Sequence, residues 1–317
     1  MDNQHGRGHL DRAGDRRKDP DWIEAQLKDR SSRFVVLWRD QQLLIGNDGN
    51  FRAALLEREA LRGIPIETSE AVFLGLDHEK ASTFALDLTG LEDPLAQIEA
   101  PGSLEESLSF QGLMTTAQHL DDREAALLTF ARGMANWHRR HRFCGVCGAP
   151  ANAAEGGHVR VCSNAACASQ HFPRTDPAVI MLVTDGDRCL LGRQKVWPKS
   201  FHSVLAGFVE PGESLEHAVA REVQEEAGIQ VDQVTYYGSQ PWPFPASIML
   251  GFRARAVTTD INVDAVELES AEWYSRDWLL SLPNDGEFIF PRRAPIAGRM
   301  ISIAGCMVED WLEGRFD

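Results

Sequence analysis

The sequence predicts an α/β protein with a β-rich N-terminal region and a metal-binding segment ahead of a larger α/β domain. Three observations lead to this fold class. Short apolar segments separated by polar turns dominate residues 31–88. Four cysteines follow as two close pairs between residues 144 and 167. Beyond residue 176, strand-like and helix-like segments alternate, which is typical of α/β architecture.

The length of 317 residues is typical of about two domains, with enough chain to bury a sizeable core. We expect residues 1–30 to form a disordered tail, because residues 1–20 mix acidic and basic side chains and have no apolar core. Residues 31–140 are expected to form a β-rich domain that ends in a helix. A ribbon at 141–175 and the main α/β domain at 176–317 complete the predicted organisation.

The balance of charge excludes several classes of partner. The chain has 47 acidic and 32 basic residues, a net charge of −15, so it gains no general attraction to DNA, RNA or anionic lipid. No segment approaches the ~18 consecutive apolar residues of a membrane-spanning helix, and the N-terminus lacks a secretory signal. We therefore expect a cytosolic protein with no DNA or membrane partner.

The N-terminal region is predicted to contain two hairpins and a helix. Apolar segments flank polar turns within residues 33–45 and again within residues 71–86. Asp121 and Glu124 have the spacing of a capping box, which marks the start of a helix running to about His138. Its apolar stripe has helical spacing: Ala125, Leu128, Ala131 and Ala135.

The four clustered cysteines predict a structural zinc site. Cys144 and Cys147 are separated by two residues, and Cys162 and Cys167 by four, with fourteen residues between the pairs. Zn²⁺ prefers four thiolates in a tetrahedron, and two close pairs allow each turn to supply two ligands beside backbone N–H groups. Such a closed shell leaves no position for substrate. His158 and His171 remain alternative ligands.

The α/β domain is predicted to begin with two strands, at residues 178–183 and 188–192, before a helix at 215–227. Further strands are expected near residues 233–237 and 247–255. The helix follows a loop that contains Gly207, Pro211 and Gly212, starts near Ser214, and ends at Gly228, which suits a left-handed C-cap.

The helix at 215–227 carries an unusual group of carboxylates. Glu222, Glu225 and Glu226 project from one side, next to the loop at Gly207. Solvated helix faces usually interleave lysine or arginine, whereas here only Arg221 is near. Hard divalent cations such as Mg²⁺ or Mn²⁺ bind such oxygen ligands, and can hold a diphosphate and activate water.

This segment resembles the Nudix box: a glycine at 207, five residues, Glu213, seven residues, then 221–229 with every defined position present. The resemblance implies a Nudix hydrolase with an α/β/α sandwich and two or three Mg²⁺ or Mn²⁺ ions. It also implies that Glu222, Glu225 and Glu226 bind these ions, and that Arg221 orients the carboxylates of the helix. Glu213 would support the loop, and the carbonyl of Ala206 would lie beside the metals.

Residues 239–247 alternate three prolines with the aromatics Trp242 and Phe244. The residues alone leave open whether these rings fill the core or offer a stiff platform for a base. The segment resembles the signature of NADH pyrophosphatases, a zinc-ribbon branch of the Nudix family. That resemblance implies a homodimer and one structural Zn²⁺ per chain. It implies a further metal ligand at Glu267 and these substrate contacts: Phe172, Phe208, Gln240, Trp242, Phe244, Ser247, Ile296 and Ala297.

By this resemblance the reaction is hydrolysis of the diphosphate of NADH or NAD⁺ to the nicotinamide mononucleotide and AMP. An alternative is removal of an NAD cap from RNA 5′ ends, for which a basic path would be needed. A rival of another class is a nucleotide-sensing or interaction module, and a diadenosine polyphosphatase fits the signature less well. The sequence does not identify the general base. The basic path has four candidate residues: Arg132, Arg139, Arg140 and Arg142.

Overall fold

The computed structural model describes residues 10–47, 49–99, 107–283, 288–291 and 302–316. The chain divides into two compact units. The first comprises Met1–Thr175 and Pro243–Ala246, and the second comprises Asp176–Trp242 and Ser247–Asp317. Among the helices of the described residues, none combines the length and the apolar composition that crossing a membrane requires.

The first unit is built on a seven-stranded sheet with the order β3-β2-β1-β6-β5, in which β4 also pairs with β1 and β7 with β2. The two predicted hairpins are present as β1–β2 and β5–β6, and the parallel pair β1–β6 joins them. The strands are β1 Arg33–Trp38, β2 Gln41–Asn47, β3 Asn50–Ala53, β4 Leu55–Glu57, β5 Ala71–Leu76, β6 Ser82–Asp87 and β7 Leu108–Gly112.

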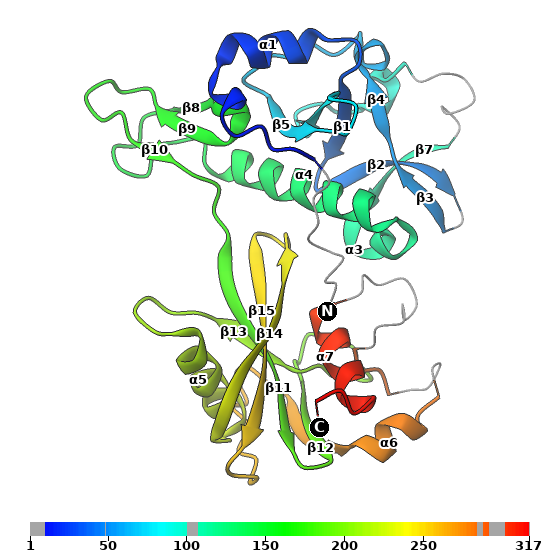
Figure 1. The fold of residues 1–317 in the computed structure, drawn as a ribbon, viewed down its shortest axis with the longest axis vertical. Helices are drawn as coiled ribbons and strands as arrows, with labels where there is room; N and C mark the ends of the chain where they lie inside the picture. Colours follow the sequence, from blue (N-terminus) through cyan, green and yellow to red (C-terminus); the bar gives the residue numbers. More distant parts are fainter. Residues whose placement is uncertain (1–9, 48, 100–106, 284–287, 292–301, 317) are drawn as a thin grey trace. The chain divides into compact units, whose positions relative to one another are not determined.

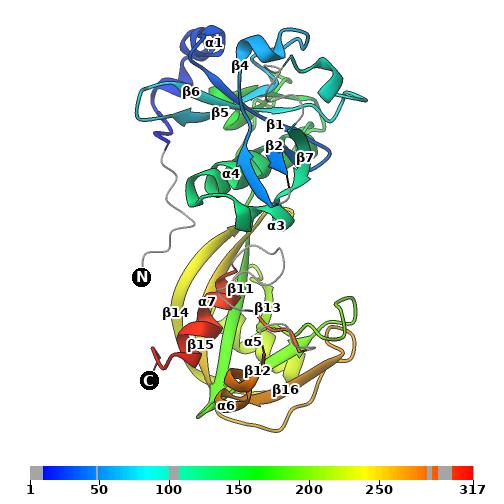
Figure 2. The same cartoon turned by 90° about the vertical axis from the view of Figure 1, so that its right-hand side faces the viewer.

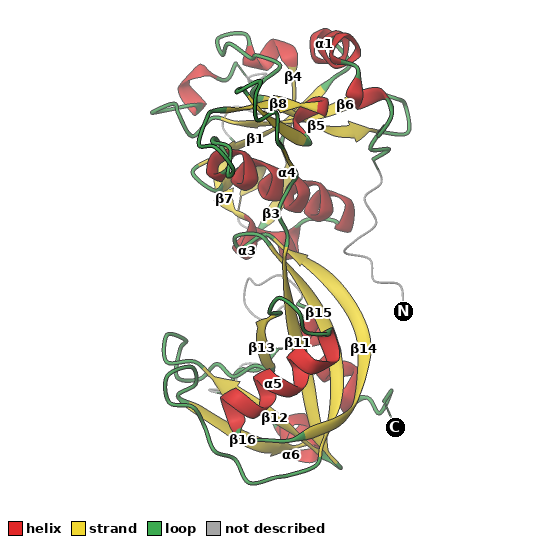
Figure 3. Cartoon of the chain, turned by 90° about the vertical axis from the view of Figure 1, so that its left-hand side faces the viewer, coloured by secondary structure: helices red, strands yellow, loops and turns green. Residues whose placement is uncertain are grey.

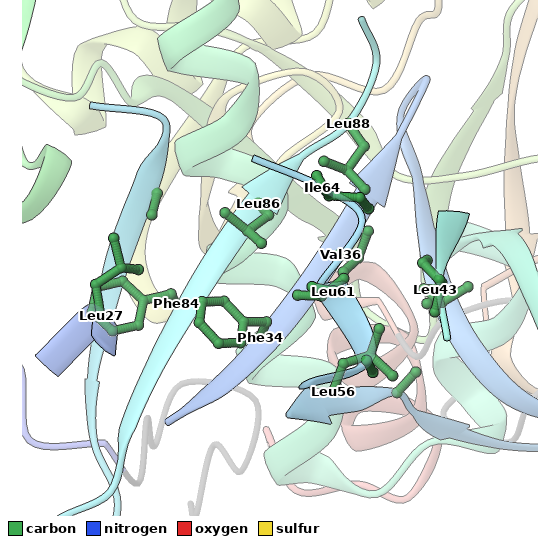
Figure 4. Packing of buried hydrophobic residues seen from close by; sticks show 14 of the residues in the cluster. Leu27, Phe34, Val36, Leu43, Leu56, Leu61, Ile64, Phe84, Leu86 and Leu88 are labelled. Carbon is green, nitrogen blue, oxygen red and sulfur yellow. The ribbon is translucent and has the colours of Figure 1, made fainter. Parts of the chain in front are cut away.

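Helices cover both faces of this sheet: α1 (Pro20–Lys28) lies on one side and α4 (Asp122–Arg140) on the other (Figure 3). Phe34, Val36 and Phe84 point to the α1 side, where they form an apolar core with Leu27 (Figure 4). The predicted capping box of α4 is present, because Asp121 and Glu124 cap each other's backbone N–H groups. A short helix, α3 (Leu113–Thr116), precedes α4.

The prediction of a disordered tail over residues 1–30 is wrong for the segment that contains η2 (Arg16–Lys18) and α1. Asp19 caps α1 by accepting hydrogen bonds from the backbone N–H groups of residues 21 and 22, and Pro20 occupies the first helical position. Ile23 and Leu27, four residues apart, are both buried. Burial of this short apolar stripe outweighs the polar composition around it.

The cysteine segment forms a three-stranded antiparallel sheet with the order β10-β9-β8. Its strands are β8 Ala151–Ala154, β9 Val159–Cys162 and β10 Gln170–His171. Two turns, each carrying a cysteine pair, precede β8 and follow β9. The ribbon predicted from the cysteine spacing is therefore present.

The second unit is an α/β/α sandwich around a six-stranded sheet with the order β14-β15-β11-β12-β16, in which β13 also pairs with β11. Figure 2 shows β14, β15 and β11 as long neighbouring strands. The elements are β11 Asp176–Asp185, β12 Arg188–Arg193, β13 Leu205–Phe208, α5 Leu215–Ala227, β14 Val231–Trp242, β15 Ser247–Ala256, β16 Ser270–Ser275, α6 Arg276–Ser281 and α7 Ile303–Leu312.

Alternation along β11 divides the second unit into two cores. Val179 and Met181 pack with the apolar stripe of α5, whereas Ile180 and Leu182 pack with α7 on the other face. Figure 1 shows α5 and α7 on opposite sides of this sheet. The predicted sandwich is confirmed, and its parallel pair β11–β15 is buried on both faces.

Candidate active site and zinc ribbon

The helix α5 begins and ends where its sequence predicts. The side chain of Ser214 accepts a hydrogen bond from the backbone N–H of His217, and Gly228 adopts the left-handed conformation with φ 70°. The buried stripe of Ala218, Val219 and Val223 fixes the helix against the sheet. Its carboxylates consequently have a fixed direction relative to β13.

Gly207 on β13 allows the helix and the strand to approach closely. A Cβ atom at this position would lie 1.9 Å from Cδ of Glu222 and 2.1 Å from both of its carboxylate oxygens. Real Cβ atoms do not tolerate such contacts, so only glycine permits the Glu222 carboxylate to lie against the strand backbone. The first position of the motif therefore has a direct steric role.

Arg221 organises the carboxylates on one side of the site. Its Nε and Nη2 donate to Glu213 at 3.0 and 2.7 Å, and Nη1 donates to Glu222 and Glu225, both at 2.9 Å. Nη2 also donates to the carbonyl oxygen of Phe208 at 2.9 Å. The hydrogen bonds from Arg221, together with one from the Glu210 N–H, lower the pKa of Glu213 to about 2. A lysine could not reproduce this planar fork.

Three carboxylates from two parts of the chain converge beside this fork. One oxygen each from Glu222, Glu226 and Glu267 lies within 4.8 Å of the others. Burial, followed by repulsion from the neighbouring carboxylates, raises the pKa of Glu226 to about 8. Burial is also the largest cause of the raised pKa of Glu222. Within the described part of the chain, no cationic side chain forms an ion pair with Glu226.

This donor set fits hard divalent cations. Its oxygens belong to carboxylates, two of which are buried, and a cation of high charge density would offset both burial and repulsion. Glu225 is not part of this cluster, because it turns toward Arg221 and is about half exposed, at 54% of its side chain. Ala206 directly precedes Gly207 on β13.

The four predicted zinc ligands lie together in the first unit, with all sulfurs within 4.8 Å of one another. The Sγ atoms of Cys144 and Cys167 are 3.8 Å apart, close to the spacing of about 3.8 Å that a tetrahedron of Zn–S bonds requires. Cys147 and Cys162 are 3.4 Å apart. The donor set therefore fits Zn²⁺. The backbone N–H of residue 146 lies 3.4 Å from the Cys144 sulfur, as expected for such a turn.

The two alternative histidine ligands differ in their surroundings. His171 lies beside the cluster, with Nε2 3.2 Å from the Cys144 sulfur. His158 instead forms hydrogen bonds to Phe73 and Arg17. The four cysteines complete a tetrahedral set without either ring.

Two residues predicted to contact substrate are buried on neighbouring strands of the second unit. Gln240 on β14 and Ser247 on β15 are 5% and 8% exposed. The side-chain oxygen of Gln240 accepts a hydrogen bond from the backbone N–H of Ile303 at 2.7 Å, which attaches β14 to the first turn of α7. No spacing in the sequence indicates this link, because 63 residues separate its partners.

The aromatic residues predicted to bind substrate are distributed over both units. Phe208 on β13 is 60% exposed and belongs to the second unit, as does Trp242, which pairs with Ser247. Phe172 is 64% exposed and belongs to the first unit, together with Phe244. The predicted residues Ile296 and Ala297 lie outside the described residues.

Family comparisons match three consecutive parts of the chain. Residues 174–292 match the NUDIX domain, and residues 139–172 match the NADH pyrophosphatase zinc ribbon domain. Residues 31–137 match the NADH pyrophosphatase-like rudimentary NUDIX domain. This match covers the seven-stranded sheet of the first unit.

Relatives are similar along most of the chain. NAD-capped RNA hydrolase NUDT12 of Macaca fascicularis is 35% identical over 340 residues, which cover 96% of this chain and 72% of the relative. NAD-capped RNA hydrolase NudC of Stutzerimonas stutzeri is 38% identical over 251 residues, covering 79% and 84%. The solved NUDIX hydrolase structure from Nitrosomonas europaea aligns with 55% of this chain and 92% of its own, at 20% identity and a TM-score of 0.43.

Proposed function

This chain belongs to the zinc-ribbon NADH pyrophosphatase family of Nudix hydrolases, and we propose that it hydrolyses the diphosphate of NADH and NAD⁺ to the nicotinamide mononucleotide and AMP. The observation that carries this proposal is the convergence of Glu222, Glu226 and Glu267 beside the Arg221 fork, in a chain with a complete Nudix box. The family relationship supports a substrate of the NAD type.

We assign the cation site to Glu222, Glu226 and Glu267, with Glu225 and the carbonyl of Ala206 as further ligands. When bound, Mg²⁺ or Mn²⁺ ions, two or three in number, would supply charge for the diphosphate and lower the pKa of a bound water. Arg221 holds Glu213, Glu222 and Glu225 in place before substrate arrives. This preorganisation reduces the rearrangement that binding requires.

We assign substrate binding to both buried polar groups and exposed rings. The exposed ring of Phe208 offers a flat face on the strand that leads to the cation site. Gln240 and Ser247 would hydrogen-bond the dinucleotide. The remaining proposed contacts are Phe172, Trp242, Phe244, Ile296 and Ala297.

The proposed organisation has three functional domains after the N-terminal segment: residues 31–140, the ribbon at 141–175 and the hydrolase at 176–317. One Zn²⁺ per chain would stabilise the ribbon without taking part in hydrolysis, because four sulfur ligands fill its coordination shell. We also propose a homodimer, which size-exclusion chromatography with light scattering would test. A cytosolic location remains a prediction.

A second candidate substrate is NAD-capped RNA, because the NUDT12 and NudC relatives are both named NAD-capped RNA hydrolases. The same diphosphate would be cleaved, with an RNA chain attached to the adenosine. Of the four basic residues considered for an RNA path, Arg140 and Arg142 are exposed. Arg132 and Arg139 already bind acidic or carbonyl groups of the protein.

The deciding experiment incubates the purified chain with Mg²⁺ or Mn²⁺ and with NADH, NAD⁺ or a 5′-NAD-capped RNA, and resolves the products by chromatography. We expect AMP and the mononucleotide from the free dinucleotides, and no product from Glu226→Gln. The rates on the three substrates determine which is preferred. Survival of all three substrates with folded, zinc-loaded protein would instead favour a nucleotide-sensing module.

A further inference from the structure

The tip of the β14–β15 hairpin is held by a helix of the first unit. Residues 243–246 join the two strands and belong to the same unit as α4. Arg132 of α4 donates from Nε to the carbonyl oxygen of Pro243 at 2.9 Å, and Asn136 donates from Nδ2 to that of Pro245 at 3.2 Å. The guanidinium carbon of Arg132 lies 4.9 Å from the centre of the Phe244 ring.

The side chains of Arg132 and Asn136 are largely buried, and Arg132 has a further hydrogen bond within the first unit. The Arg132 side chain is 13% exposed, and Asn136 is 8% exposed. Arg132 also donates from Nη1 to the backbone carbonyl of Asp40, so a second acceptor helps to orient its guanidinium. A hydrogen bond donated by a cation and a cation–π contact are each stronger in such partly desolvated surroundings than on an open surface.

The held tip is bonded directly to the strands that carry the proposed substrate contacts. Trp242 pairs with Ser247 at the end of the hairpin, and Gln240 pairs with Met249 two positions further along. Gln240 is fixed at its side chain by the N–H of Ile303. The main chain around Gln240 and Ser247 is thus constrained at the tip by α4 and at Gln240 by α7.

We propose that Arg132 and Asn136 are positioning residues for the hydrolysis reaction, which fix the hairpin so that Gln240 and Ser247 meet the dinucleotide. Arg132 then also holds the ring of Phe244, one of the proposed substrate contacts, in place. The inference rests on the proposed hydrolysis of NADH. The proposal also explains the prolines of residues 239–247. Pro243 and Pro245 supply the carbonyl acceptors, on a stiff turn with few alternative conformations.

The test compares the full-length wild type with Arg132→Ala, Arg132→Lys and Asn136→Ala, using steady-state NADH hydrolysis at saturating Mg²⁺. Arg123→Ala is the matched control, because Arg123 is exposed in the first turn of the same helix. Circular dichroism melting and zinc content establish that each variant is folded. Arg132→Ala is also combined with Ser247→Ala in a double-mutant cycle.

We expect Arg132→Ala to raise KM about tenfold with little change in kcat, since it misplaces binding groups distant from the cations. Arg132→Lys should give an intermediate KM, and in the Ser247→Ala background the removal of Arg132 should change KM by less than about twofold. A KM equal to that of Arg123→Ala would overturn the inference. A second contradicting result would be a lower kcat with an unchanged KM, by the same factor in the wild-type and Ser247→Ala backgrounds. That result would indicate only a smaller amount of folded enzyme.

A wild type that leaves NADH intact would contradict the proposed function itself. An active wild type with unaffected Arg132 and Asn136 variants would contradict only the positioning role. The two failures are therefore separate results of the same experiment.

Discussion

His158 donates a hydrogen bond from Nε2 to the backbone carbonyl oxygen of Phe73 at 2.7 Å. A carbonyl can only accept, so the proton resides on Nε2 and Nδ1 must be an acceptor in the neutral ring. Arg17 supplies the matching donor, with Nη1 2.9 Å from Nδ1. Protonation of His158 would place a second N–H against the Arg17 guanidinium and break this hydrogen bond.

His138 repeats the same arrangement in the same unit. Its Nε2 donates to the carbonyl oxygen of Gly157 at 2.7 Å, and its Nδ1 accepts from Arg160 Nη1 at 2.9 Å. Burial, the largest cause, lowers the pKa of each histidine to about 4. Neighbouring cations add to this effect, whereas Asp87 and the carbonyl contacts oppose it.

The first prediction is a loss of stability in mild acid. Because the folded pKa lies below that of the unfolded chain, the unfolded state binds more protons between about pH 4 and pH 6.5, and stability falls as the pH falls through this range. Each histidine contributes a slope of about 1.4 kcal/mol per pH unit. In urea unfolding, His158→Gln should be less stable than the wild type at pH 7, and this difference should shrink toward pH 5.

His78→Gln is the control, since the His78 side chain is 88% exposed. Its unfolding curves should follow those of the wild type at every pH. A constant difference between the wild type and His158→Gln across pH 5–7 would contradict the prediction, because it would mean that His158 has the same pKa in the folded and the unfolded chain.

Local spacing predicted the parts of the site that lie within one element. Ser214 and Gly228 bound α5 as expected, and the i,i+4 pair Glu222 and Glu226 meets in space. Glu225 lies on the same side of the helix by spacing, yet it turns toward Arg221. Rotamer choice, which depends on neighbouring side chains, separates residues that the helical period places together.

Long-range contacts could not be predicted from the residues alone. Glu267 joins the cluster from a loop 41 residues beyond Glu226, and only the family resemblance indicated it. The hydrogen bond from Arg132 to Pro243 spans 111 residues. The helix α1 was missed because its apolar stripe has only two buried residues, Ile23 and Leu27, in an otherwise polar segment.

The second prediction is that Glu226→Gln stabilises the metal-free protein while it abolishes function. Burial and three carboxylates, Glu222, Glu267 and Glu225, disfavour charge at this position, so a neutral amide relieves repulsion when no cation is bound. In the presence of a chelator, we expect the free energy of unfolding to rise by about 1 kcal/mol. NADH hydrolysis should fall at least about a hundredfold. Thermal unfolding with and without Mg²⁺ measures the change in stability.

Glu216→Gln provides the matched control, because Glu216 is exposed in the first turn of the same helix. It should keep both the activity and the Mg²⁺-dependent rise in melting temperature. If Glu226→Gln retained that rise in full, Glu226 would not contribute to cation binding.

The third prediction concerns the ribbon. Cys162→Ser should lose the bound zinc and lower the melting temperature, because an incomplete tetrahedron cannot hold the turns on either side of β8 and β9. Cys306→Ser tests specificity, since Cys306 lies on α7 in the second unit and outside the cluster. Zinc measured by plasma emission should be about one per chain for Cys306→Ser and near zero for Cys162→Ser. Equal zinc in both variants would contradict the assignment.

The fourth prediction separates capped RNA from free dinucleotide. Arg140 and Arg142 are exposed at the end of α4 and just beyond it, whereas Arg139 pairs with Asp40 and Asp87. If these two exposed cations bind the RNA phosphates, the double variant Arg140→Ala/Arg142→Ala should lower kcat/KM on a 5′-NAD-capped RNA and leave NADH hydrolysis unchanged. The slope of log kcat/KM against log salt should become shallower by about 0.7 for each phosphate that is no longer neutralised.

The net charge of −15 helps to separate the two substrates in this experiment. The protein has no general attraction to RNA that would mask the removal of two cations. A double variant at Arg30 and Arg123, both exposed in the first unit, removes the same charge elsewhere. It should keep the salt slope of the wild type. Equal slopes for all three proteins would place the RNA path elsewhere, whereas an equal decrease in both double variants would indicate only a dependence on total charge.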